Sequence, residues 1–102
     1  MIRLKVKTLR TFREKSVGLI GAESISPVMF TTRWGIHTFG VRHPIDVLIL
    51  DTHNRVVCMK KSLPPNRFFL WNPRYYTVIE VPAGTVHAHD IKVGSQISPE
   101  QK

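Results

Sequence analysis

The chain has 102 residues, of which 42% are hydrophobic and 22% are charged. This length fits a single domain over residues 1–102, and the charged fraction is too low for a disordered chain. No apolar run reaches the length of a signal peptide or a membrane span, and the single Cys58 cannot form an internal disulfide. We therefore expect one soluble, cytoplasmic domain.

The apolar and polar pattern predicts many short strands and almost no helix. In chain order, the expected strands are residues 3–8, 28–32, 36–39, 45–50, 55–61, 75–81 and 85–91. Residues 45–50 form a nearly continuous apolar run, which is typical of a strand buried on both faces. Residues 66–74 have no usable period and read as a loop.

One short helix is expected near the N-terminus, between Thr11 and Glu23, because Thr11 can cap it with Glu14 three residues later. Short strands joined by Gly and Pro turns indicate a mainly β domain, a small β-sandwich or barrel of jelly-roll-like form.

Three segments in a fixed order resemble the domain-of-unknown-function family one hundred ninety-two. They are residues 37–51, residues 54–57 and residues 78–84, and Gly18-Leu19-Ile20 corresponds to an early motif of that family. The resemblance runs from about Gly18 to Ile97. It implies an all-β, sandwich or jelly-roll-like domain of prokaryotic type, and it brings no activity with it.

Asp46 and Glu80 each interrupt an apolar strand, in a chain with only seven carboxylates. A buried carboxylate is costly without a partner, so we interpret both as satisfied core groups, with Arg42 the nearest partner for Asp46. The alternative is a small hydrolase-like enzyme in which His37, Asp46 and Glu80 share a cleft.

Four histidines, at positions 37, 43, 87 and 89, raise the question of a metal site. His87 and His89 would share one face of the expected strand over residues 85–91. Zinc needs a third ligand and an ordered second shell, and none stands in register, so we expect neither metal nor cofactor.

The segment from Arg67 to Tyr76 interleaves cations with aromatic rings. Such a segment caps the open end of a β core, as a lid, or binds single-stranded nucleic acid. The binding residues expected here and nearby are Arg42, Arg67, Phe69, Trp71 and Arg74.

The net charge of +8 favours an anionic ligand or protein partner and gives no sequence specificity. The function is thus open, and the sequence favours a small non-catalytic domain with a basic surface that binds a partner or ligand. Nucleic acid is an alternative, no membrane contact is expected, and both a monomer and a homodimer fit.

Overall fold

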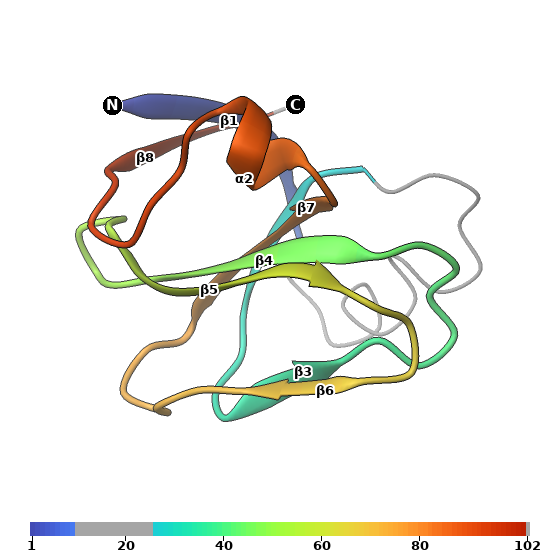
Figure 1. The fold of residues 1–102 in the computed structure, drawn as a ribbon. Helices are drawn as coiled ribbons and strands as arrows, with labels where there is room; N and C mark the ends of the chain where they lie inside the picture. Colours follow the sequence, from blue (N-terminus) through green and yellow to red (C-terminus); the bar gives the residue numbers. More distant parts are fainter. Residues whose placement is uncertain (10–25, 102) are drawn as a thin grey trace.

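A computed structural model describes residues 1–9 and 26–101, and most of its strands join one six-stranded sheet (Figure 1). The sheet order is β5-β4-β7-β2-β1-β8. These strands are β1 (Ile2–Thr8), β2 (Val28–Thr31), β4 (Ile45–Leu50), β5 (Val56–Leu63), β7 (Thr77–Pro82) and β8 (Ile97–Gln101). β4 pairs antiparallel with β5 and β7, whereas β1 runs parallel to both β2 and β8. The mainly β class is therefore confirmed.

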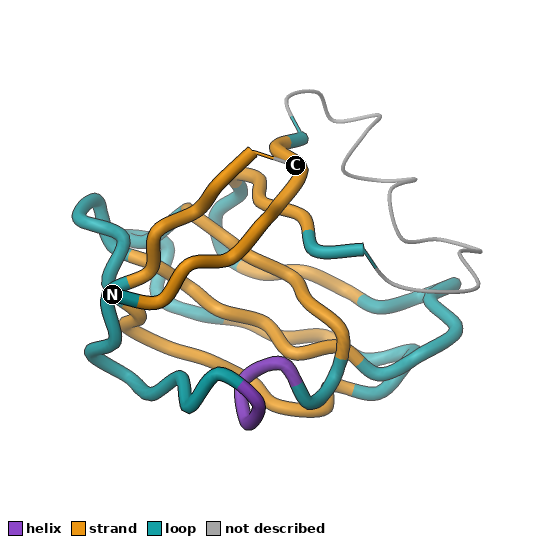
Figure 2. Tube along the Cα trace, turned by 90° about the horizontal axis from the view of Figure 1, so that it is seen from above, coloured by secondary structure: helices purple, strands orange, loops and turns teal. Residues whose placement is uncertain are grey.

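The sheet curls until its two edge strands, β5 and β8, meet at one point. Arg55, just before β5, bridges Gln96, just before β8. The N–H of Val56 donates to the carbonyl oxygen of Ser95 at 2.9 Å, and the N–H of Ile97 donates to that of Asn54 at 2.9 Å. Figure 2 shows this curl from above. The sheet is thus a half-barrel that closes at one end, rather than a complete sandwich or barrel.

β4 lies at the centre of the molecule, and all six of its residues are buried, as the apolar run predicted. Because side chains alternate across a strand, its residues contribute to two separate cores. Ile45, Val47 and Ile49 belong to one core cluster. Leu48 and Leu50 belong to the other, inside the curl with residues of β1 and β8.

A second, two-stranded sheet covers the first core cluster (Figure 1). It pairs β3 (Gly35–His37) with β6 (Phe68–Leu70), and we call it the β3–β6 ribbon. Residues 68–70 thus form a strand where a loop was expected. The buried Thr38 holds the ribbon, because its hydroxyl donates to the Pro64 carbonyl at 2.6 Å and accepts from the N–H of Arg67 at 2.9 Å.

The described part of the chain has its short helix near the C-terminal end, at α2 (Thr85–Ala88). The strand expected over residues 85–91 was wrong. Gly84 has a φ of 97° and turns the backbone into the helical turn of α2, where the N–H groups of Gly84 and Val86 donate to Asp46 of β4. The helix expected between Thr11 and Glu23 lies outside the described residues. No helix within the described ranges is long and apolar enough to cross a membrane.

Candidate functional site

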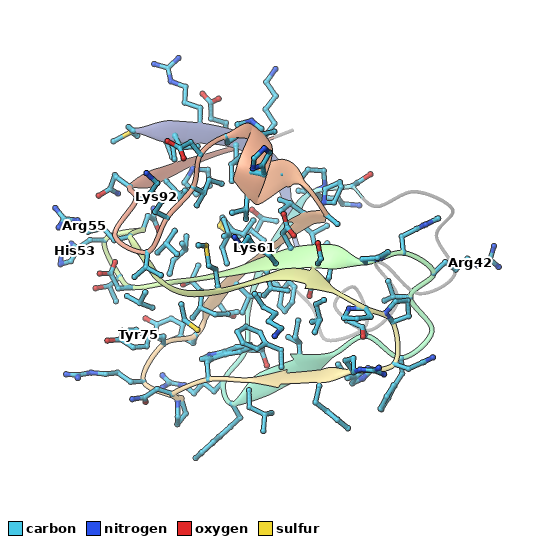
Figure 3. All side chains as sticks on the ribbon, in the orientation of Figure 1. Arg42, His53, Arg55, Lys61, Tyr75 and Lys92 are labelled. Carbon is cyan, nitrogen blue, oxygen red and sulfur yellow. The ribbon has the colours of Figure 1, made fainter. Side chains whose placement is uncertain are left out.

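The β3–β6 ribbon and its flanks expose large apolar side chains. The exposed fractions are 68% for Trp34, 42% for Phe39, 65% for Phe68 and 70% for Leu70. Figure 3 shows side chains projecting from the ribbon on the side away from the six-stranded sheet. With the exposed His37, these residues form what we call the ribbon surface. Monomeric proteins rarely expose contiguous apolar patches without a functional reason, so this surface is the leading candidate site.

The aromatic rings of the ribbon surface hold one another in place. His37 pairs with Phe68 across the ribbon, and the ring of Phe39 contacts both. Its centroid lies 5.0 Å from that of His37, nearly parallel, and 5.0 Å from that of Phe68, edge to face. The Nδ1 atom of His37 also accepts a hydrogen bond from the N–H of Phe39 at 3.3 Å. The three rings therefore form a preorganised platform.

Trp34 and Gly35 shape the other end of the ribbon surface. Trp34 has a φ of 78°, a left-handed conformation that a bulky side chain rarely adopts and that costs about 1–3 kcal/mol. Leu70 lies against Gly35, where an added Cβ would come within 2.4 Å of Leu70 Cδ2 and 2.7 Å of the Phe69 carbonyl oxygen. Glycine thus lets Leu70 lie across the ribbon, while local strain accompanies an exposed indole.

Positive charge surrounds this surface. The two sequence segments that build it, residues 26–45 and 52–79, contain no Asp or Glu. They carry the exposed arginines Arg33, Arg42, Arg55, Arg67 and Arg74, and the exposed Lys60 and Lys61 of β5. The guanidinium of Arg33 lies 4.7 Å from the ring centroid of Tyr76 and donates to the Pro73 carbonyl at 2.9 Å. Figure 3 places Arg42 at one end of the molecule and Arg55 at the opposite end.

The structure divides the five binding residues expected from the sequence. Arg42, Arg67 and Arg74 are exposed, but Phe69 and Trp71 face the core beneath the ribbon. Trp71 Nε1 donates to the carbonyl oxygen of Tyr75 at 2.7 Å, and its ring centroid lies 5.6 Å from that of Phe69. These two rings therefore cover the core as a lid. The exposed rings were missed because the strand period of residues 68–70 becomes clear only with the pairing to β3.

Asp46 is buried on β4 and faces the core inside the curl, and backbone groups alone hold its carboxylate. Oδ1 accepts from the N–H of Ser62 at 2.8 Å, and Oδ2 accepts from those of Gly84 and Val86 at 3.0 Å each. A bulge in β5 brings Ser62 into place, with a φ of 52°. The expected partner Arg42 lies exposed, so the carboxylate is satisfied in another way than predicted.

Glu80 lies on β7 and faces the opposite core, because its cross-strand neighbours Val28 and Val47 both belong to the cluster beneath the ribbon. It is 7% exposed. Burial raises the pKa of its carboxyl group from 4.5 to about 7. Among the residues that the structure describes, no hydrogen bond or ion pair reaches this carboxylate. Glu80 thus differs from Asp46, and the partner expected for it from the sequence is not found in the described ranges.

The three candidate catalytic residues do not share a cleft. His37 lies on the exposed ribbon surface, while Asp46 and Glu80 face opposite sides of the six-stranded sheet. His87 belongs to α2 and His89 follows it, so the shared strand face expected for them does not exist. Residues 1–9 and 26–101 hold no group of three His, Cys, Asp or Glu placed to bind a metal ion.

Comparisons with known proteins fit this fold. A family model described as "Uncharacterized ACR" (DUF192) matches residues 2–99, and no curated protein matches. A protein of unknown function from Novosphingobium aromaticivorans superposes with a TM-score of 0.77 at 17% identity, over 87% of this chain and 70% of that chain. A protein from Sinorhizobium meliloti, described as a candidate transcription regulator, gives 0.76 at 17% identity, over 89% and 78%. Both likenesses concern the fold alone. Since the family model spans nearly the whole chain, this protein belongs to the domain-of-unknown-function family DUF192.

Proposed function

We propose that this protein is a binding domain that holds an anionic partner on the ribbon surface. One observation carries the proposal: large apolar side chains are exposed together on a unit built from segments without any carboxylate. Apolar groups contribute to binding when they leave water, and the surrounding arginines select a negatively charged partner. The net charge of +8 adds long-range attraction that speeds the encounter.

A partner other than a second copy of this chain fits the surface better. Two ribbon surfaces packed about a twofold axis would bring Arg33, Arg67 and Arg74 of each copy together. No carboxylate stands in the segments that build the surface, so these like charges would repel without compensation. The same argument favours any partner that supplies the missing negative charge.

A reducing compartment such as the cytoplasm suits this domain. Its single Cys58 is partly buried against the core beneath the ribbon, where it packs as a small apolar group. No other cysteine in the chain can pair with it, so stability has to come from the two cores instead of a disulfide.

The test follows backbone amide signals by NMR while the full chain is titrated with heparin, a polyanion without aromatic groups. We expect the largest shifts at residues 33–42 and 66–74, which frame the ribbon surface. Dextran, an uncharged polysaccharide, serves as the control and should shift none of them. If the largest shifts instead centre on Lys5 and Lys7 of β1, the ribbon surface is not the anion site and the proposal fails.

A further inference from the structure

The ribbon surface presents mainly aromatic rings, with Leu70 as its one large aliphatic side chain. Three of the rings, His37, Phe39 and Phe68, fix one another at centroid distances of 5.0 Å. Exposed rings held in this way offer flat faces at little cost in side-chain entropy. Flat faces suit a ligand that is itself made of flat rings, because stacking contributes about 1–3 kcal/mol for each base in contact.

The cations closest in sequence to these rings are arginines, whereas Lys60 and Lys61 lie on β5 of the six-stranded sheet. Residues 16–59 and 62–91 contain no lysine, and their basic side chains, apart from histidine, are Arg33, Arg42, Arg55, Arg67 and Arg74. A guanidinium group stacks on aromatic faces and bonds phosphate in a bidentate manner, which a lysine ammonium does not do. Arg33 already stacks on Tyr76 at 4.7 Å. Rings and arginines together match a partner that has both bases and phosphates.

From these observations, and resting on the proposed function, we infer that the anionic partner is single-stranded nucleic acid, whose bases stack on Phe39, Phe68 and Trp34 while arginines hold its phosphates. A duplex fits less well, because its bases are already stacked and paired and cannot reach the rings. An anionic lipid surface also fits less well, because the His37 imidazole, in contact with Phe39, would have to enter the apolar layer.

The experiment measures binding by fluorescence anisotropy of a labelled, mixed-sequence single-stranded oligonucleotide at fixed salt. The wild type is compared with Phe39→Ala/Phe68→Ala, which removes two rings and no charge. Val93→Ala, which shortens an exposed apolar side chain outside the ribbon, is the matched control. Phe39→Tyr/Phe68→Tyr keeps the rings and should keep the affinity. Heparin, a duplex of the same sequence and vesicles of phosphatidylcholine with phosphatidylserine are measured in parallel.

We expect the double alanine variant to lose about 5- to 150-fold in oligonucleotide affinity for each base that no longer stacks, and less than about two-fold in heparin affinity, since only the bases stack. Val93→Ala should bind as the wild type does. Trp34 provides a second readout: bound oligonucleotide should quench tryptophan fluorescence in the wild type, and most of this quenching should disappear in Trp34→Phe. This readout stays valid even if the double variant is poorly folded.

Two results would overturn the inference while leaving the proposed function intact. In the first, the double alanine variant keeps its oligonucleotide affinity, whereas Arg67→Gln/Arg74→Gln loses affinity for both oligonucleotide and heparin. In the second, the duplex or the vesicles bind more tightly than the single strand and lose that binding in the double alanine variant. If neither pair of substitutions changes binding to any polyanion, the proposed function itself fails.

Discussion

Asp46 and Glu80 are two buried carboxylates on neighbouring strands of one sheet, and they differ in the hydrogen-bond donors that reach them. Asp46 faces the core inside the curl and accepts three backbone hydrogen bonds. Glu80 faces the core beneath the ribbon, and the described part of the chain offers its carboxylate no donor. Three N–H groups satisfy the carboxylate of Asp46. At Glu80, burial without such donors raises the pKa of the carboxyl group to about 7.

The three bonds to Asp46 also join segments that are distant in the sequence. Ser62 belongs to the bulge of β5, Gly84 to the turn after β7, and Val86 to α2. One side chain thereby fixes the position of the helix relative to β4 and β5. Because α2 has only four residues, it is too short to be stable by itself and depends on such a contact.

The largest effect is expected from Asp46→Ala, which leaves three N–H groups without their acceptor. We expect a loss of about 2–4 kcal/mol in the free energy of unfolding, measured by urea denaturation. Asp46→Asn should also destabilise, although asparagine has the same shape. Its NH₂ group is a donor and would face at least one backbone N–H group, which is also a donor.

The matched control is Asp51→Ala, at the end of β4. Asp51 also bonds backbone groups, and the N–H of Arg55, followed by that of His53, lowers the pKa of its carboxyl group. Asp51 is only partly buried, however, so water replaces these bonds and the loss should be smaller. Equal denaturation midpoints for the two alanine variants would contradict the role assigned to Asp46.

An effect of intermediate size is expected from Glu80→Gln, and its sign depends on pH. The folded state holds the Glu80 proton up to about pH 7, whereas an ordinary glutamate loses it near 4.5. Between these values the unfolded state binds fewer protons, so stability falls as pH rises, by up to about 3 kcal/mol once pH exceeds 7. Glutamine cannot ionise, so the variant should be more stable than the wild type at about pH 8 and not at about pH 4.

Urea denaturation across this pH range checks the prediction for Glu80. Glu100→Gln, which removes one carboxylate from β8, serves as the control and should keep the slope of the wild type. If Glu80→Gln also keeps that slope, the Glu80 carboxylate has a partner in the folded state, and the contrast with Asp46 disappears.

The smallest effect is expected from Gly84→Ala, at a donor to Asp46. Gly84 has a φ of 97°, which an alanine adopts at a cost of about 1 kcal/mol, and an added Cβ would meet no atom within 4 Å. Gly94→Ala is a close control, since its φ is 96° and its surroundings are equally open. We expect equal losses of thermal stability. A much larger loss at Gly84 would mean that the methyl group displaces the N–H from Asp46.

Sequence patterns were sufficient where a segment carries its own period. The run from Ile45 to Leu50 predicted a strand buried on both faces, and all six residues are buried. The return of the chain into β5 and the alternation of β1 were also visible. Asp46 was rightly taken as a satisfied core group, because an unpaired charge at this position would be too costly.

The remaining features depend on contacts between distant segments. The donors to Asp46 come from a bulge and a turn whose positions only the folded sheet defines. The helical turn at residues 85–88 has no hydrogen bond to a capping side chain of its own. Its Val86 N–H donates instead to Asp46 of β4, a contact that the local sequence does not indicate. In the candidate site, the three residues of β6 are too few to show the alternation of a strand. Only the pairing with β3 shows that Phe68 faces outward and Phe69 inward.

The pairing of β1 with β8 has a consequence for how the chain folds. Residues 2–6 lie beside residues 97–101 in parallel register, so this part of the sheet joins segments almost a full chain length apart. During synthesis β1 waits without this neighbour until nearly every other strand has been made, and its free edge is open to wrong pairing in the meantime. Closing so long a loop before its contacts stabilise it also slows refolding, and mainly β domains of this kind fold in roughly milliseconds to seconds.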